Sequence, residues 1–175
     1  MDLQTAIELI RSPHISAAKT TRWADLGSGS GLFTNALSKL LLPGSEILAV
    51  DKIKGPAIRG FPPEIRLQQL TLDFITDDLP FGDLDGILMA NSFHYVRDKI
   101  AFSGKLRRLL NKTGILVIVE YDTMIPVQGW VPYPIDFMTL KAFFQNSGFG
   151  SVDKLAEYPS VFGTRMYAAI IRSKT

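Results

Sequence analysis

The sequence contains no cysteine, which excludes disulfides, thiolate nucleophiles and zinc–thiolate sites. This absence fits a reducing compartment, and we predict no metal site. The chain also has little excess charge. Its formal net charge at pH 7 is only +2, so the composition gives no support for nucleic acid as the partner.

Long hydrophobic runs are also missing, and we expect no secretory leader. The N-terminus lacks a basic region followed by an apolar core. The longest apolar runs, residues 115–119 and 168–171, have the length of strands and are too short to span a bilayer. We therefore expect a soluble, cytoplasmic protein with no membrane span, and a homodimer stays open.

The composition that is present is that of a folded protein. The chain has 175 residues, of which 46% are hydrophobic, and it shows no internal repeat, linker or low-complexity tract. We predict a single domain over residues 1–175. Residues 1–20 would form an N-terminal helix and lead-in, and residues 21–172 the core.

Helical and extended patterns alternate along most of the chain. Apolar spacing predicts helices over residues 3–10, 32–42 and 96–110, and strands over 22–26, 46–50, 65–70, 84–90 and 115–120. Glycines and prolines in residues 52–64 leave no room for a crossover helix, so we expect an irregular loop there. This alternation is typical of a parallel sheet with helices on both faces.

The C-terminal part departs from this alternation. A helix is predicted over residues 137–146, followed by strands over 150–158 and 162–172 with a turn around Pro159 and Ser160. Strands joined so closely must be antiparallel. The predicted fold class is α/β, with a doubly wound, Rossmann-like and mostly parallel seven-stranded sheet that ends in an antiparallel C-terminal hairpin.

Three alternating glycines, Gly27, Gly29 and Gly31, separate the first predicted strand from the helix that follows it. Glycines allow a ligand to approach the main chain at the carboxyl ends of such strands. The dinucleotide fingerprint would need a glycine where Leu32 stands, which disfavours a nicotinamide oxidoreductase. Asp25 would be poorly placed beside a pyrophosphate and well placed beside a cation. A plain Gly/Ser turn is the alternative.

Residues 25–31, DLGSGSG, resemble motif I of the class I S-adenosylmethionine-dependent methyltransferases. The resemblance extends over about residues 21–172. It implies S-adenosylmethionine as cofactor, S-adenosylhomocysteine as product, and in-line methyl transfer to a small molecule. It also implies that Asp51, at the end of the second strand, accepts hydrogen bonds from the cofactor's ribose. A solvated strand-end aspartate is the alternative for Asp51.

Further positions follow from the same resemblance. Asp73 would meet the adenine amino group and Phe74 would pack on the ring; the alternatives are a turn cap and a core residue. Asn91 would lie along the methionine part of the cofactor. The cofactor-binding residues are thus predicted to be Asp25, Gly27, Ser28, Gly29, Gly31, Asp51, Lys52, Asp73, Phe74 and Asn91.

His94 is the candidate catalytic residue, because imidazole can orient a nucleophile or accept its proton near neutral pH. It could instead pack against the adenine edge or cap the next helix. Residues 123–136 form a stiff aromatic loop, which we interpret as a wall of the substrate pocket; a connector covering the core is the alternative. The predicted pocket residues are His94, Tyr95, Tyr121, Trp130 and Tyr133.

Two other functions compete with a small-molecule methyltransferase. An RNA ribose methyltransferase would share the short segment between the second and third strands and the basic helix 96–110. Those enzymes carry a catalytic aspartate where this chain has Asn91. A non-catalytic partner protein could keep the fold for assembly, although the intact Asp25, glycine loop and Asp51 argue against it.

Overall fold

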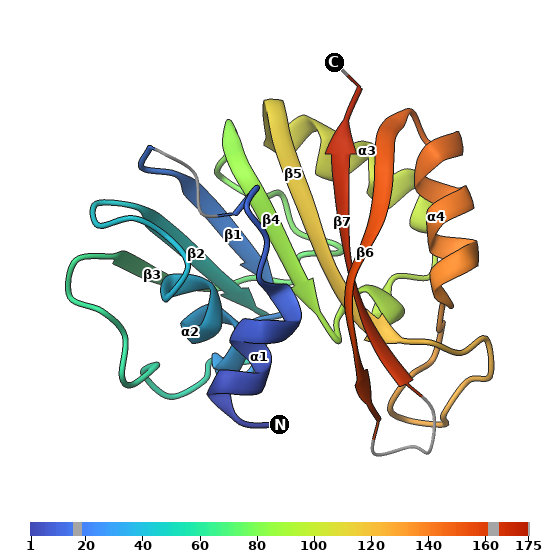
Figure 1. Ribbon diagram of the computed structural model, residues 1–175, viewed down its shortest axis with the longest axis horizontal. Coiled ribbons are helices and arrows are strands. Elements are labelled where there is room, and N and C mark those ends of the chain that lie inside the picture. The colour runs from blue at the N-terminus through green and yellow to red at the C-terminus, as the bar shows by residue number, and fades with distance from the viewer. Residues whose placement is uncertain (16–18, 161–164, 175) are drawn as a thin grey trace.

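A computed structural model describes residues 1–15, 19–160 and 165–174. Its centre is one seven-stranded sheet in the order β3-β2-β1-β4-β5-β7-β6 (Figure 1). The strands are β1 (Arg22–Leu26), β2 (Glu46–Asp51), β3 (Arg66–Thr71), β4 (Leu84–Ala90), β5 (Leu110–Tyr121), β6 (Phe149–Pro159) and β7 (Arg165–Ser173).

The strand directions confirm the predicted fold class. Strands β1 to β5 pair in parallel, whereas β7 is antiparallel to both β5 and β6. From β1 the chain continues to β2 and β3 on one side of β1, and it then returns to place β4 on the other side of β1. The strand order therefore reverses between β1 and β4, and open sheets of this kind bind ligands beyond the carboxyl ends of such strands.

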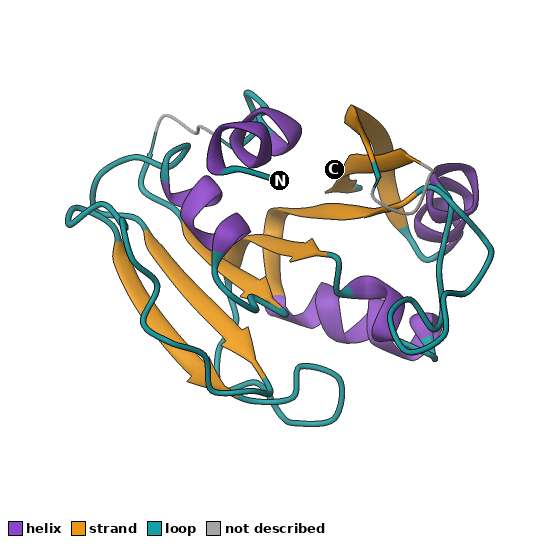
Figure 2. Ribbon diagram, turned by 90° about the horizontal axis from the view of Figure 1, so that it is seen from below, coloured by secondary structure: helices purple, strands orange, loops and turns teal. Residues whose placement is uncertain are grey.

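Helices cover both faces of the sheet (Figure 2). On one face, α1 (Leu3–Ile10) and α2 (Leu32–Ser38) pack in a buried cluster around Trp23. On the other, α3 (Lys99–Leu109) and α4 (Phe137–Asn146) pack in a cluster that includes Phe93. A short 3-10 turn, η1 (Phe93–Tyr95), follows β4. Two buried hydrophobic clusters, one on each face of the sheet, thus hold the strand ends that carry the candidate site.

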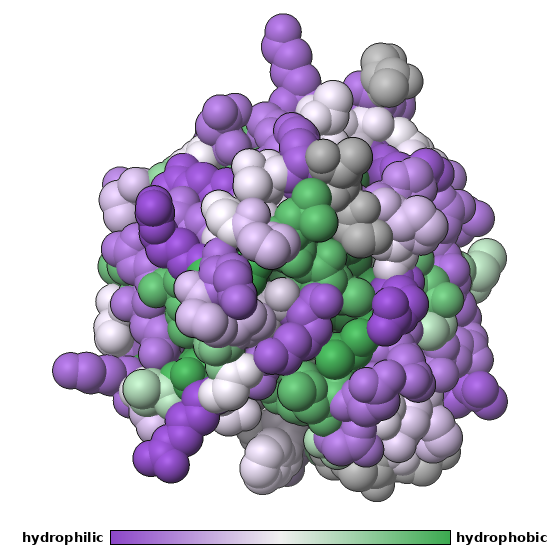
Figure 3. All heavy atoms as spheres, turned by 60° about the vertical axis from the view of Figure 1, so that its left-hand side comes forward, coloured by the Kyte–Doolittle hydropathy of each residue, from purple (hydrophilic) through white to green (hydrophobic). Residues whose placement is uncertain are grey.

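The segment between β2 and β3 is the irregular loop that its glycines and prolines predict. Residues 52–64 contain no helix or strand, and the loop still contributes to the core through partly buried Phe61. On the side of α2 and β3, hydrophobic side chains gather in the middle of the face and hydrophilic ones surround them (Figure 3). Strand β3 is correspondingly exposed at four of its six positions, so the crossover loop leaves part of this side of the sheet uncovered.

Two helices are shorter than predicted, for local reasons. Helix α2 ends at Ser38 instead of residue 42, because the N–H groups of Lys39 and Leu40 bond to carbonyls three residues back and tighten the last turn. Helix α3 begins at Lys99 instead of residue 96, because the Asp98 side chain caps it by accepting a hydrogen bond from Ala101 N–H at 3.0 Å.

The C-terminal strands are longer than predicted. Strand β5 begins at Leu110, directly after α3, and β6 continues through Pro159, where the turn was expected. The predicted start of the last strand at residue 162 lies outside the described residues. In the described parts of the chain, no helix combines the length and apolar character needed to cross a membrane.

Candidate functional site

The glycine loop after β1 is held against the end of β2. The N–H groups of Gly27 and Ser28 both donate to the Val50 carbonyl, at 2.8 and 3.0 Å. Gly29 has a φ of +52°, and a Cβ atom added there would meet nothing within 4 Å. Gly29 therefore presents bare main chain to open space, as expected of a loop that a ligand approaches.

Asp25, on β1, is a buried carboxylate at the base of this loop. Its Oδ2 accepts a hydrogen bond from Thr34 Oγ1 at 2.6 Å, whereas its Oδ1 is buried with no hydrogen-bond partner in the described residues. Burial raises the pKa of Asp25 to about 7; the Thr34 hydrogen bond opposes this rise and the nearby Asp51 charge adds to it. A cationic group placed at Oδ1 would satisfy this oxygen.

Asp51 ends β2 and faces the glycine loop. Its Oδ2 accepts a hydrogen bond from Gly29 N–H at 2.8 Å, and its Oδ1 accepts one from Ile53 N–H at 2.9 Å. A carboxylate oxygen has two lone pairs, so each oxygen can accept a further bond. The main chain thus fixes the orientation of Asp51 and leaves both oxygens able to bind two adjacent hydroxyl groups.

The turn after β3 brings two more predicted residues to the site. Asp73 Oδ1 accepts a hydrogen bond from Ile75 N–H at 2.9 Å, so Asp73 does cap its own turn. Phe74 is buried and meets Phe102 edge to face, with ring centroids 5.8 Å apart. Both residues also line the pocket described below, so their structural contacts are compatible with the predicted contacts to the adenine.

Asn91, after β4, has a conformation that is uncommon for a residue with a side chain. Its φ is +53°, its N–H donates to the Val119 carbonyl at 2.9 Å, and its Oδ1 is buried without a partner in the described residues. Next to it, Ser92 Oγ donates to the Leu26 carbonyl at 2.6 Å and ties the ends of β4 and β1 together. Such local strain is often found at ligand sites.

These residues share one pocket of about 470 Å³ at the reversal of the strand order. Ten predicted site residues line it: Asp25, Gly27, Ser28, Gly29, Asp51, Lys52, Asp73, Phe74, Asn91 and Tyr95. Sequence reasoning did not anticipate Ser30, Leu32, Phe33, Ile53, Ile75, Ala90 and Ser92, which complete the lining. The other predicted residues, Gly31, His94, Tyr121, Trp130 and Tyr133, are not part of this lining.

His94 lies directly behind the pocket wall. Its ring centroid is 4.4 Å from that of Tyr95, which does line the pocket, and 6.1 Å from that of Tyr121. Burial raises the pKa of Tyr121, and the Glu120 charge raises it further. His94 thus has two phenols and one carboxylate, that of Glu120, among its neighbours.

That carboxylate, Glu120, holds His94 by two hydrogen bonds. Glu120 Oε1 accepts from the His94 main-chain N–H at 3.0 Å, and Oε2 lies 2.8 Å from Nδ1. Both side chains are at most 3% exposed, and Nε2 has no partner in the described residues. An ionised carboxylate only accepts, so in the neutral imidazole Nδ1 carries the proton and Nε2 is left as an acceptor. Sequence reasoning missed Glu120; a lone acid in the apolar strand that neighbours β4 is the signal for it.

The aromatic loop, residues 123–136, is attached beside His94 at its base and exposed at its tip. Tyr133 N–H donates to the His94 carbonyl at 3.0 Å, and Val131 and Ile135 are buried. Trp130, in contrast, is 68% exposed. The loop therefore covers core at its base and exposes Trp130 at its tip, and its role as a wall of the substrate pocket stays a prediction.

The fold and the pocket define a doubly wound α/β domain with a ligand site at its switch point. The sequence matches the methyltransferase domain family over residues 24–116, more than half of the chain, and the protein belongs to that family. The predicted resemblance to the class I S-adenosylmethionine-dependent methyltransferases is thereby confirmed. No curated protein is a detectable match to this sequence.

Several solved structures share the fold. An N1-methyltransferase of 1,6-didemethyltoxoflavin from Burkholderia thailandensis, solved with that compound and S-adenosylhomocysteine, has a TM-score of 0.74 at 17% identity, over 99% of this chain and 78% of its own. An S-adenosylmethionine-dependent methyltransferase from Aquifex aeolicus has a TM-score of 0.63 at 16% identity, over 99% and 100%. The CurJ carbon methyltransferase has 0.69 at 19%, over 99% and 59%.

Proposed function

We propose that this protein transfers the methyl group of S-adenosylmethionine to a small-molecule acceptor, with the cofactor in the pocket between the glycine loop and the ends of β2, β3 and β4. The observation that carries the proposal is a pair of buried acceptors, Asp25 Oδ1 and Asn91 Oδ1, in the lining of this pocket and without partners in the described residues. S-Adenosylmethionine carries an ammonium and a sulfonium group, which buried oxygens of this kind would stabilise.

The remaining lining residues suit the rest of the cofactor. Asp51 has an oxygen available for each ribose hydroxyl, and the bare main chain at Gly29 allows close approach. Asp73 and Phe74 supply a carboxylate and an aromatic surface for the adenine. A pocket of about 470 Å³ lies in the range of small-ligand sites.

The chemistry asks little of the protein beyond alignment and proton removal. The bound cofactor supplies an activated methyl group, and alignment alone is worth up to about 10⁵–10⁸ M in effective molarity. We assign proton removal to His94: Nε2 accepts the proton that the acceptor loses, while Glu120 holds Nδ1–H and stabilises the resulting imidazolium. Because Tyr95 lies between His94 and the pocket, an acceptor would have to enter beside the Tyr95 ring.

A small molecule is favoured over RNA because three of the four cations of α3 donate hydrogen bonds within the fold. Lys99, Lys105 and Arg107 each donate to main-chain carbonyls within the fold. They are therefore not arranged as a free basic surface for a phosphate backbone. The solved neighbours methylate nitrogen in one case and carbon in another by name, so the fold does not fix the acceptor atom.

The proposal also covers the number of domains, the cellular location and the oligomeric state. We take residues 1–175 as one domain, because both core clusters draw on elements from the beginning and the end of the chain. A cytoplasmic location and a homodimer remain predictions. Size-exclusion chromatography with light scattering would decide the latter.

The proposed function is tested by calorimetry and mass spectrometry. Titration of the purified protein with S-adenosylhomocysteine should show one site per chain. Mass spectrometry of the freshly purified protein should find this nucleoside and a second small molecule. A protein that binds neither S-adenosylmethionine nor S-adenosylhomocysteine would refute the assignment of the pocket.

A further inference from the structure

Two lysines of α3 reach in different directions and bind the main chain of two different segments. Lys99 Nζ donates to the Tyr133 carbonyl at 2.9 Å and to the Val96 carbonyl at 2.8 Å. Lys105 Nζ donates to the Asp77 carbonyl at 2.5 Å, with the Ile75 carbonyl 3.5 Å away. One helix is thus connected to both the aromatic loop and the turn after β3.

The Lys99 contact fixes the aromatic loop beside His94. The main chain of Tyr133 is held from both sides, since its N–H donates to the His94 carbonyl and its carbonyl accepts from Lys99. The Lys99 ammonium also lies 5.2 Å from the Phe93 ring centroid and 5.9 Å from that of Tyr133. Burial lowers the pKa of Lys99, and the Glu120 charge opposes this shift. Lys99 thus places a cation near the buried pair of His94 and Glu120.

The Lys105 contact fixes the turn that contains Asp73 and Phe74. Hydrogen bonds from Ile75 N–H to Asp73 Oδ1 and from Asp73 N–H to Asp77 Oδ2 give this turn its own shape. They do not attach it to the rest of the fold. Phe74, packed on Phe102, attaches its first half to α3, and Lys105 attaches its second half.

We propose that Lys99 and Lys105 are positioning residues with separate tasks. Lys105 holds the turn that contacts the cofactor, and Lys99 holds the aromatic loop beside His94, so a single helix sets where cofactor and acceptor lie relative to each other. The cofactor part of this inference rests on the proposed function. Neither lysine touches the reacting atoms.

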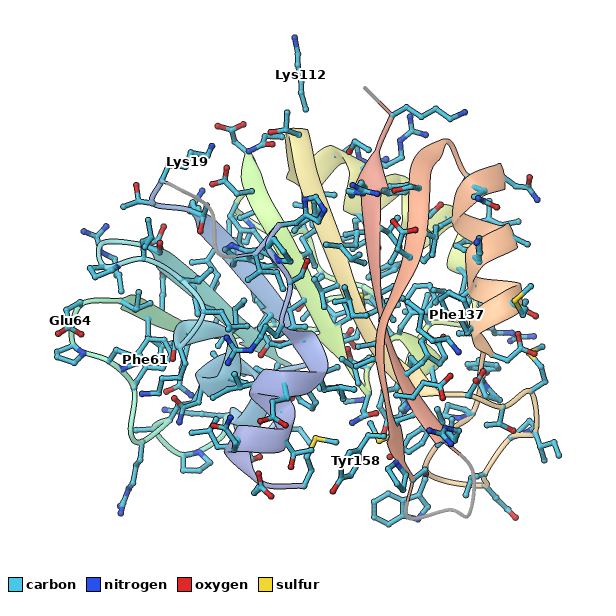
Figure 4. The ribbon with its side chains drawn as sticks, in the orientation of Figure 1. Lys19, Phe61, Glu64, Lys112, Phe137 and Tyr158 are labelled. Carbon is cyan, nitrogen blue, oxygen red and sulfur yellow. The ribbon has the colours of Figure 1, made fainter. Side chains whose placement is uncertain are left out.

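The experiment compares Lys99→Met with Lys105→Met, since methionine keeps most of the apolar stem and removes the charge. Lys112→Met is the matched control: the exposed Lys112 points away from the fold (Figure 4), and it has no hydrogen bond or ion pair among the described residues. Two quantities are measured on the full chain. They are S-adenosylhomocysteine affinity by calorimetry and local amide exchange by mass spectrometry.

Each variant should affect one segment. Lys105→Met should weaken S-adenosylhomocysteine binding by about 3- to 10-fold, the effect of losing one hydrogen bond, and speed amide exchange in residues 73–77. Lys105→Arg should restore most of the affinity. Lys99→Met should leave the affinity unchanged and speed exchange in residues 130–135.

Three results would overturn the inference. They are unchanged affinity in Lys105→Met, unchanged exchange of residues 130–135 in Lys99→Met, and equal loosening of both segments in either variant. The last would mean that α3 acts only through general stability. If the wild-type protein fails to bind S-adenosylhomocysteine, the proposed function fails, and amide exchange, which needs no ligand, still decides whether the lysines hold the two segments.

Discussion

The main-chain N–H of Gly29 donates to Asp51 Oδ2 at 2.8 Å, so the acid at the end of β2 holds the glycine loop that follows β1. These residues lie 22 positions apart in the sequence. A ligand that occupies the open space above Gly29 must also meet the Asp51 carboxylate. The loop and the carboxylate therefore act as one binding element, and removal of the carboxylate should weaken ligand binding.

Substitution of Asp51 by alanine should weaken S-adenosylhomocysteine binding by about 1–3 kcal/mol, the cost of losing charge-assisted hydrogen bonds. Calorimetry measures this change. Glu64→Ala is the matched control, because Glu64 is an exposed carboxylate on the far side of the crossover loop (Figure 4). Unchanged affinity in Asp51→Ala would contradict the ribose role of Asp51.

Cofactor binding should depend on the charge of Asp25. Burial raises the pKa of Asp25 to about 7, so the carboxyl is largely protonated below that pH and cannot pair with an ammonium group. We expect S-adenosylhomocysteine affinity to increase between pH 6 and pH 8, by up to about tenfold per pH unit below the pKa. The variant Asp25→Asn should bind more weakly at pH 8 and show a flatter profile. A wild-type profile that is already flat would contradict this prediction.

The same carboxyl should lower the stability of the ligand-free protein at high pH. The folded-state pKa of about 7 exceeds the ordinary value of 3.8, so the folded state binds more protons than the unfolded chain between these values. The free energy of unfolding therefore decreases as pH rises from about 4 to about 7. Relative to Asp25→Asn, the wild type should lose on the order of a few kcal/mol across this window.

Urea unfolding of both proteins at pH 5 and pH 8 measures this difference. Other carboxyls with shifted pKa values, such as Asp85 and Glu157, contribute equally to both proteins and cancel in the comparison. A gain in stability of the wild type relative to Asp25→Asn between pH 5 and pH 8 would contradict a raised pKa of Asp25 in the folded state.

Removal of the buried pair behind the pocket should affect turnover and spare cofactor binding. We expect His94→Ala to lower methyl transfer by about 10²- to 10⁴-fold, the usual contribution of a general base. Glu120→Gln, which keeps a hydrogen-bond acceptor but removes the charge, should lower it less. The assay uses the acceptor found by co-purification, and calorimetry follows S-adenosylhomocysteine in parallel. Normal turnover in His94→Ala would make His94 structural.

Most of the fold could be predicted because its signals are local. Apolar periodicity and turn residues determine the order of strands and helices, and the irregular loop over residues 52–64 follows from its glycines and prolines. Helix boundaries were less predictable because they depend on single contacts. The Asp98 cap places the start of α3 three residues beyond the predicted one, at Lys99.

The site residues that belong to a family motif could be predicted. The contacts between residues distant in the sequence could not. The glycine loop, Asp51 and Asn91 lie at strand ends that a family motif marks, and they meet in one pocket. The His94–Glu120 contact joins η1, the turn after β4, to β5 across 26 residues, and the lone acid in β5 does not by itself identify its partner. The exposure of Trp130 likewise depends on how the loop is attached to the fold, and composition alone does not predict that attachment.

Two glycines of the loop should respond differently to the same substitution. A Cβ atom at Gly27 would overlap Ser92 Cβ, and the Ser92 side chain is held by the hydrogen bond from its Oγ to the Leu26 carbonyl, so Gly27→Ala should mainly lower stability. A Cβ atom at Gly29 would meet no protein atom within 4 Å. Because Gly29 lines the pocket, we expect this atom to take up space that the ligand would occupy. The positive φ of Gly29 adds a strain of about 1 kcal/mol for alanine. Gly29→Ala should therefore lose more S-adenosylhomocysteine affinity than its loss of thermal stability explains. Calorimetry and thermal unfolding of both variants separate the two effects, and full affinity in Gly29→Ala would show that the ligand does not lie over this main chain.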